Sequence, residues 1–146
     1  MSVYIRPIEN KDYPAIIELF KEFALFEKLP EKMTNSVSQI ENEEAFFNCF
    51  VAEVNGIIVG YTTYFYAYYS WVGKSLYLDD LYVTKTYRNK GIGKELLNTV
   101  INLAKESNCK KVRWQVSNWN TNARNFYKHI GAEIDDVELN CDLILK

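Results

Sequence analysis

The chain has 146 residues, of which 48% are hydrophobic and 15% aromatic, which is enough apolar material for a single folded domain over residues 1–146. Its 17 basic and 19 acidic residues leave a net charge of −2, so we expect neither nucleic acid nor anionic lipid as a partner. No apolar run approaches the ~20 residues of a membrane span, and the first residues, MSVYIRPIENKDY, lack an export pattern, so we expect a cytoplasmic protein.

Cysteine and histidine are too sparse for a disulfide framework or a metal site. Cys49, Cys109 and Cys141 include no CxxC pair, and we expect each to be a buried or half-buried thiol. His129 is the only histidine in the sequence, which excludes a site with two histidine ligands. We therefore expect no metal.

The first half of the chain begins with a strand pattern, continues with two helix patterns and ends with two strand patterns. Its predicted elements are a strand over Val3–Pro7, a helix over Tyr13–Glu27, a weaker helix over Ser36–Phe47 and strands over Phe50–Val54 and Ile57–Tyr68. The last two strands meet at Asn55-Gly56, the dipeptide preferred in a two-residue hairpin. They therefore predict an antiparallel pair.

The second half continues with shorter elements. Its predicted elements are strands over Lys74–Val83, Lys110–Val116, Glu133–Val137 and Leu139–Leu145, and helices over Ile92–Ser107 and Asn122–Ile130. Together the two halves predict an α/β (α+β) fold. Its central sheet is mixed, mostly antiparallel and twisted, with about seven strands flanked by about four helices.

A basic glycine loop, RNKGIG over residues 88–93, separates one predicted strand from the longest downstream helix. Bare N–H groups at a helix start, with the cations Arg88, Lys90 and Lys94 nearby, favour an anion such as phosphate. Glu95 follows Lys94, which excludes a P-loop, and Leu96 stands where a dinucleotide fingerprint needs glycine. The alternative is an ordinary tight turn with incidental lysines.

The loop pattern R-x-x-G-x-G resembles motif A of the GNAT superfamily of N-acetyltransferases. Downstream, NTNARNFYKHIGA over residues 120–132 resembles the second signature of that superfamily, N-x-x-A-x-x-F-Y-x-x-x-G-A. The similarity covers nearly the whole chain. Residues 71–132, with a weaker echo at Leu25–Glu27, resemble the diamine branch, which includes spermidine/spermine and thialysine acetyltransferases.

The resemblance implies acetyl-coenzyme A (acetyl-CoA) as the co-substrate. In the family, the glycine loop holds the pyrophosphate, a strand edge pairs with pantetheine, and the second signature contacts the coenzyme. The corresponding residues here are Arg88, Asn89, Lys90, Gly91, Ile92, Gly93 and Lys94 in the loop, Leu81, Tyr82 and Val83 on the strand, and Asn120, Asn125 and Tyr127 in the second signature.

Acetyl transfer from a thioester needs a neutral amine and a proton for the departing thiolate. A tyrosine hydroxyl, with a reference pKa of ~10, carries its proton at neutral pH and can donate it. The resemblance implies that Tyr127 is this general acid. The alternative is a helix aromatic that packs on the sheet, and Asn120 has a similar alternative as a helix cap.

Asp79 and Asp80 are adjacent on a predicted strand, so we expect them to point to opposite faces. A carboxylate in this otherwise apolar run is costly unless it is paired or functional. The diamine branch has Glu-Asp here, engaging the substrate amine. Asp79 replaces the glutamate, so the resemblance implies that Asp79 is the catalytic group that handles the amine. It is one methylene shorter, which favours a bridging water as proton carrier; the alternative is a solvated strand residue.

Glu27 and Trp71 are further candidates for the amine side of the site. A tryptophan face with carboxylates forms a reasonable cage for an ammonium group. Both align with substrate-side positions of the branch, although either suits an ordinary helix end or turn equally well. With Asp79 and Asp80, they predict a cationic substrate.

The predicted function is therefore an acetyl-CoA-dependent N-acetyltransferase that modifies a small cationic primary amine by direct transfer in a ternary complex. The amine is a diamine, a polyamine or a lysine-like amino acid. The resemblance also implies a homodimer. The alternatives are a protein or peptide N-acetyltransferase, or a non-catalytic CoA-binding module.

Overall fold

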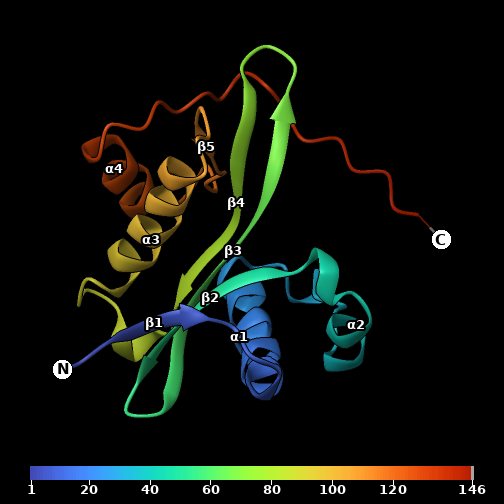
Figure 1. The fold of residues 1–146 in the computed structure, drawn as a ribbon, viewed down its shortest axis with the longest axis vertical. Helices are drawn as coiled ribbons and strands as arrows, with labels where there is room; N and C mark the ends of the chain where they lie inside the picture. Colours follow the sequence, from blue (N-terminus) through green and yellow to red (C-terminus); the bar gives the residue numbers. More distant parts are fainter. Residues whose placement is uncertain (146) are drawn as a thin grey trace. The chain divides into compact units, whose positions relative to one another are not determined.

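The computed structural model describes residues 1–145, which separate into two compact units, 1–114 and from Gln115 onward. The first unit contains β1 (Tyr4–Pro7), η1 (Asn10–Asp12), α1 (Tyr13–Phe26), η2 (Pro30–Lys32), α2 (Val37–Asn42), η3 (Glu44–Phe46), β2 (Asn48–Val54), β3 (Ile57–Tyr69), β4 (Gly73–Val83), η4 (Lys85–Tyr87), α3 (Ile92–Glu106) and β5 (Val112–Arg113) (Figure 1). The second contains α4 (Thr121–His129).

The strands form one mixed sheet in the order β1-β2-β3-β4-β5. Pairing is antiparallel from β1 to β4, and β4 pairs with β5 in parallel. The predicted mixed, mostly antiparallel sheet and four α-helices are confirmed. Asn55 and Gly56 both have positive φ, 50° and 78°, as the predicted hairpin turn requires.

The prediction of seven strands is wrong, because the described residues form five. The segments Glu133–Val137 and Leu139–Leu145 form neither helix nor strand, and β5 covers only Val112–Arg113. Their alternating apolar residues match a strand pattern, but a strand also needs a ladder partner. Aspartate and asparagine, frequent between residues 135 and 142, are poor strand formers.

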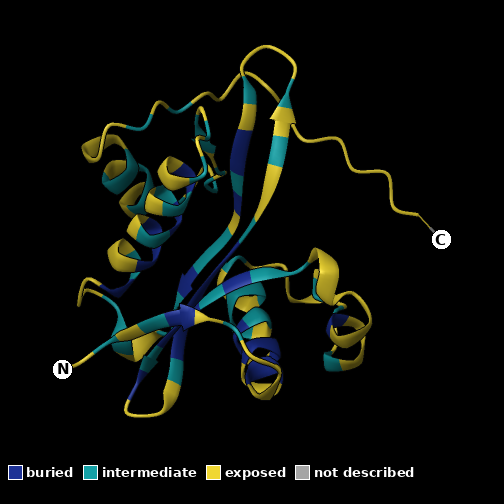
Figure 2. Cartoon of the chain, viewed as in Figure 1, coloured by how far each residue is buried: buried dark blue, intermediate teal, exposed yellow. Residues whose placement is uncertain are grey.

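Two apolar clusters lie on opposite faces of the sheet in the first unit. Ile16, Val51 and Tyr61 belong to the α1 side, whereas Val54 and Leu96 belong to the α3 side. Figure 2 shows the buried stripe of α3 facing the strands. A Cβ on the β3 glycine, Gly60, would lie 2.9 Å from the Tyr82 carbonyl oxygen of the neighbouring strand β4 and 3.4 Å from Leu96 of α3. Glycine is therefore required there.

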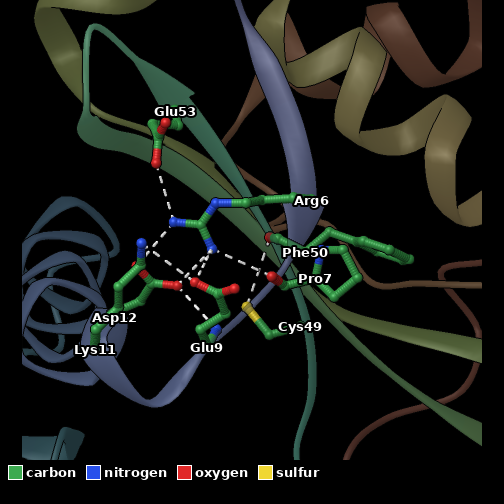
Figure 3. Close-up of polar contacts among 8 residues, drawn as sticks. All are labelled: Arg6, Pro7, Glu9, Lys11, Asp12, Cys49, Phe50 and Glu53. Carbon is green, nitrogen blue, oxygen red and sulfur yellow. Dashed lines mark hydrogen bonds and ion pairs between the residues drawn. The ribbon is translucent and has the colours of Figure 1, made fainter.

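A buried ion cluster attaches the start of α1 to the sheet (Figure 3). Arg6 on β1 donates two hydrogen bonds to Asp12, at 2.7 and 2.9 Å, and one to Glu53 on β2, at 3.0 Å. The bonds from Arg6 hold the pKa of Asp12 below its ordinary value. This attachment fixes the helix whose other end reaches the candidate site.

Candidate active site

An open cavity of about 530 Å³ lies on the α1 side of the first unit, between the end of α1, the turns that follow it, and strands β3 and β4. Its walls combine aromatic rings with charged side chains. The aromatic residues are Phe20, Phe23, Phe46, Phe47, Tyr64 and Phe65, the acids are Glu27, Asp79 and Asp80, and Lys32 is basic. Aromatic faces together with three carboxylates favour an ammonium-bearing ligand.

Asp79 and Asp80 reach this cavity through an irregularity in β4. Thr63 pairs with Asp80, whereas the next β3 residue, Tyr64, pairs with Leu78, so Asp79 is the extra residue of a β-bulge. Both carboxylates line the cavity. The expectation that they point to opposite faces is wrong, because strict alternation holds only in a regular strand.

Asp80 is held more firmly than its neighbour. The buried Tyr61 hydroxyl donates to Asp80 Oδ2 at 3.0 Å. The Thr62 hydroxyl donates to the Asp80 carbonyl at 2.8 Å, and the Asp80 N–H donates to Thr63 Oγ1 at 3.1 Å. Burial, reinforced by the charge of Asp79, raises the pKa of Asp80 to about 7, although the Tyr61 hydrogen bond opposes this. A carboxyl with that pKa can exchange a proton at neutral pH.

Asp79 keeps contact with solvent at the cavity wall. Desolvation by the surrounding protein nevertheless raises its pKa above the ordinary value. Glu27, at the C-terminal end of α1, lines the same cavity, and its charge adds to the rise in the pKa of Asp80. The structure therefore brings together three of the four predicted substrate residues.

Trp71 does not join them. It lies in the turn between β3 and β4, where it is 96% exposed, and it is not among the residues that line the cavity. The sequence pattern placed it beside Asp79 only by alignment with the diamine branch. Its role in substrate binding stays a prediction.

The glycine loop presents unused backbone donors at the start of α3. Gly91 is the N-cap residue, in the left-handed conformation with φ at 82°. The first helical bond runs from the Glu95 N–H to the Gly91 carbonyl, so the N–H groups of Ile92, Gly93 and Lys94 precede the helical ladder. A Cβ built at Gly93 would have only Val83 within 4 Å, at 3.8 Å. This open, donor-rich surface fits a phosphate group.

Arg88 does not present a free charge to that surface. Its Nε donates to the Val83 carbonyl at 2.9 Å and its Nη2 donates to the Tyr82 hydroxyl at 3.1 Å. Its guanidinium also lies over the Phe26 ring, 4.7 Å from the centroid. Arg88 therefore fixes the loop to the strand end, which leaves Lys90 and Lys94, both exposed, as the cations beside the bare N–H groups.

Glu22 extends this fixation to α1, a contact that sequence reasoning missed. Its carboxylate accepts hydrogen bonds from the Tyr82 hydroxyl at 3.0 Å and from the Thr84 hydroxyl at 2.6 Å. The sequence could have identified Glu22 by its position one helical turn from the apolar residues Leu19 and Phe26. A charge on such an apolar stripe needs a partner. The network joins the wall of the cavity to the glycine loop.

The predicted pantetheine strand has a free edge in the first unit. The ladder between β4 and β5 covers only Leu76 with Val112 and Tyr77 with Arg113. Beyond Tyr77, β4 has no β5 partner among the described residues, so no strand pairs with its backbone near Leu81 on that side, whereas the Val83 carbonyl already accepts from Arg88 Nε. The Tyr82 side chain itself is buried and stacks on Phe23.

The second unit carries the remaining predicted coenzyme residues. Asn120 is the N-cap of α4, and its side chain accepts from the Ala123 N–H at 3.2 Å, as the capping alternative expected. Asn125 is exposed, and Tyr127 is half-buried with its ring 5.6 Å from that of Phe126. The contacts of Asn120, Asn125 and Tyr127 with coenzyme stay predictions.

The thiols offer little chemistry. Cys49 is buried, and burial raises the pKa of its thiol well above the ordinary value, so it is a poor nucleophile. Cys141 is exposed, contrary to expectation, because it lies in the segment that forms no strand. Among residues 1–145 no group of three or more His, Cys, Asp or Glu side chains is arranged to hold a metal ion. No helix in that range is long and apolar enough to cross a membrane.

Comparison with known proteins first identifies the class of this protein, which is the acetyltransferases. The family model described as "Acetyltransferase (GNAT) family" matches residues 12–132, a span that includes parts of both units. The chain belongs to the GNAT family of acetyltransferases. The resemblance inferred from the glycine loop and the second signature is confirmed.

Curated relatives narrow the class to N-acetyltransferases. The chain is 34% identical over 144 residues to the mouse thialysine N-epsilon-acetyltransferase, covering 90% of this chain and 85% of that protein. It is also 34% identical over 139 residues to the human spermidine/spermine N(1)-acetyltransferase-like protein 1, covering 88% of this chain but 20% of that longer protein. These relatives belong to the branch that the sequence resembles, and the chain is an N-acetyltransferase.

Solved structures show the same fold at lower identity. A possible acetyltransferase from Clostridium difficile superposes with a TM-score of 0.80 at 23% identity, covering all of both chains. An aminoglycoside acetyltransferase from an uncultured soil sample, in complex with trehalose, gives 0.80 at 21% identity, covering 99% of this chain and 97% of that one. These likenesses establish the fold.

Proposed function

We propose that this chain transfers the acetyl group of acetyl-CoA directly to a small cationic primary amine in a ternary complex. The observation that carries the proposal is the convergence of Glu27, Asp79 and Asp80 on one aromatic cavity. Three carboxylates attract an ammonium group, and the aromatic walls cover its hydrocarbon chain. The curated relatives named for thialysine and for spermidine/spermine support this substrate class.

The chemistry requires the ammonium to lose two protons, one before and one after attack, and the leaving thiolate to gain one. An alkyl ammonium with a lysine-like pKa of ~10.4 must lose a proton before its nitrogen can attack the thioester carbonyl. Sequence reasoning assigned this step to Asp79; the geometry favours Asp80, whose pKa is about 7 and whose position is fixed by Tyr61. Asp79, on the solvent side, is suited to attracting the ammonium, directly or through water.

The departing thiolate needs a proton of its own. We assign its donor to the Tyr127 hydroxyl, on the strength of the second signature. As the nitrogen–carbon bond forms and the carbon–sulfur bond breaks, Tyr127 protonates the leaving sulfur and the attacking nitrogen loses its second proton to solvent. The products are an amide and a neutral thiol, with the first ammonium proton on the Asp80 carboxyl group. Tyr127 is then reprotonated from solvent, and Asp80 releases its proton to solvent. Backbone N–H groups of the glycine loop hold the pyrophosphate, and the free β4 edge pairs with pantetheine.

The defining experiment measures thiol release from acetyl-CoA with a panel of diamines, polyamines, lysine analogues and short peptides. We expect release with a small diamine or a lysine analogue. Release only with peptides would instead identify a protein N-acetyltransferase. Tight binding of acetyl-CoA without release for any amine would identify a non-catalytic coenzyme-binding module.

Lys94 offers a test of the coenzyme site. We expect Lys94→Glu to raise the KM for acetyl-CoA about tenfold, because it replaces attraction with repulsion beside the pyrophosphate. Lys105→Glu, an exposed site at the other end of the same helix, makes the same change in net charge and should leave that KM unaltered. Equal effects of the two variants would mean that only the total charge matters, and that the loop is an ordinary turn.

Lys32 favours an amino acid among the candidate amines. It is the one basic residue among the described residues that line the cavity, and its ammonium can pair with a substrate carboxylate. Relatives named for thialysine and for L-ornithine act on molecules with such a carboxylate. We therefore infer a basic amino acid, acetylated on its side-chain amine, in preference to a plain diamine.

Reversing this charge should change substrate preference. We expect Lys32→Glu to raise the KM for thialysine or ornithine about tenfold and to leave that for a diamine unaltered or lower. The matched control is Lys21→Glu, on the exposed face of α1 and outside the cavity. Kinetics with both substrate types give the ratio of the KM for the amino acid to the KM for the diamine. If Lys32→Glu leaves this ratio unchanged, Lys32 does not take part in substrate recognition.

We further propose that the protein works as a cytoplasmic homodimer. Exposed apolar side chains support the association, because Val137, Leu139, Leu143 and Leu145 are each more than four-fifths exposed. Light scattering on the purified chain tests the oligomeric state, and a monomer at micromolar concentration would contradict it.

A further inference from the structure

Three consecutive residues of β3 bind a single residue of β4. Tyr61 donates to the Asp80 carboxylate at 3.0 Å, Thr62 donates to the Asp80 carbonyl at 2.8 Å, and Thr63 accepts from the Asp80 N–H at 3.1 Å. The side chain and both backbone groups of Asp80 are thus engaged from one strand. These bonds lie at the bulge created by Asp79, where regular ladder geometry is lost.

The donor to the carboxylate is unusually well fixed. Tyr61 is fully buried, with its ring 5.1 Å from that of Phe20 on α1 and 6.3 Å from that of Tyr82 on β4. Burial and the neighbouring Asp80 charge raise the pKa of its hydroxyl, so the hydroxyl keeps its proton and remains a hydrogen-bond donor to Asp80. A tyrosine in this state restricts its partner carboxylate to one orientation.

We propose that Tyr61 is a positioning residue for acetyl transfer: its buried hydroxyl orients the Asp80 carboxylate toward the amine, while Thr62 and Thr63 fix the backbone of Asp80 at the bulge. This proposal rests on the proposed function of the cavity. Tyr61 itself does not line the cavity, so it acts through Asp80. Fixed orientation matters because proton transfer requires the acceptor oxygen within hydrogen-bonding reach of the amine.

The other charged and titratable groups around Asp80 come from five elements. They are Asp79 on β4, Tyr64 on β3, Cys49 on β2, Glu27 at the end of α1 and Lys32 on η2. Asp79 and Glu27 both disfavour the ionised form of Asp80. Tyr61 provides the hydrogen bond that favours it, so loss of this hydroxyl should make Asp80 harder to ionise.

The test replaces Tyr61 with phenylalanine and follows Asp80 in two independent ways. The first is an NMR titration of aspartate carboxyl carbons, with the Asp80 signal assigned by its loss in Asp80→Asn. The second is the pH dependence of kcat/KM for the amine. The matched control is Tyr13→Phe. Tyr13 is also buried, and its hydroxyl also donates to a carboxylate, that of Glu44, at 3.1 Å and away from the cavity.

In Tyr61→Phe we expect the Asp80 titration to move up by roughly one to two pH units, because a hydrogen bond to the charged form is lost. The value of kcat/KM should fall roughly five- to fiftyfold at pH 7 and recover at higher pH, as Asp80 becomes ionised. Tyr13→Phe should change neither quantity. In an Asp80→Asn background, Tyr61→Phe should have no further effect on kcat/KM.

An unchanged Asp80 titration in Tyr61→Phe would overturn the proposal. So would a fall in kcat/KM that is equal at every pH, since that pattern indicates a packing defect only. If no amine is acetylated at all, the proposed function fails, but the NMR titration still decides whether Tyr61 controls Asp80.

Discussion

Replacing Tyr127 with phenylalanine is expected to slow turnover ~10²–10⁴-fold, the usual cost of losing a general acid. The variant keeps the ring, so its packing beside Phe126 in α4 should persist. Without a donor, the thiolate must leave unprotonated or take its proton from water. Steady-state thiol release at saturating acetyl-CoA and amine measures the effect as kcat.

A change in kcat without a change in acetyl-CoA binding would place the effect of Tyr127→Phe in the chemical step. The dissociation constant for acetyl-CoA should stay within about twofold, because the lost interaction is made in the transition state. Tyr4→Phe, which removes an exposed hydroxyl on β1, is the matched control and should be fully active. Full turnover in Tyr127→Phe would remove this residue from the mechanism and leave water as the proton source.

Sequence periodicity predicted α1, α3 and the first four strands well because their apolar stripes are buried. The weaker helix predicted over Ser36–Phe47 is shorter, Val37–Asn42, and only Ile40 in it is buried. The stripe of Ile92, Leu96 and Val100 is buried at 1% exposure or less, so tertiary packing reinforces the local pattern. The segment from residue 133 to 145 shows the reverse case. Its apolar alternation finds no ladder partner among the described residues, and pattern alone does not make a strand.

The candidate site was predictable in its residue types but not in its geometry. The Asp79–Asp80 pair could be selected from sequence because carboxylates are costly in an apolar run. The bulge that brings both residues to the same cavity depends on the register between β3 and β4. The apolar pattern of a single strand does not predict that register. Arg88 shows the same limit, because a cation in a basic loop can be used internally, as its bonds to Val83 and Tyr82 demonstrate.

Asp80 should control the pH dependence of the reaction. Its pKa of about 7 predicts that wild-type kcat/KM for the amine falls about tenfold per pH unit below about pH 7, as the carboxylate becomes protonated. We expect Asp80→Asn to lower kcat/KM roughly 10²–10⁴-fold at pH 8, where the wild type is ionised, and to abolish this acid limb. The gap between the two proteins should narrow below pH 6. Asp79→Asn is the matched control. We expect it to raise the KM for the amine and to keep the acid limb of the pH profile.

The same substitution should stabilise the fold at alkaline pH. Because burial raises the folded-state pKa of Asp80, folding favours the protonated form, and stability is lost as pH rises from about 4 through about 7. Asparagine still accepts the Tyr61 hydrogen bond but carries no charge. Asp80→Asn should therefore have a higher Tm than the wild type at pH 8, with the difference vanishing near pH 4. A lower Tm at pH 8 would show that the Asp80 charge is compensated in the fold, and that its retention needs no functional explanation.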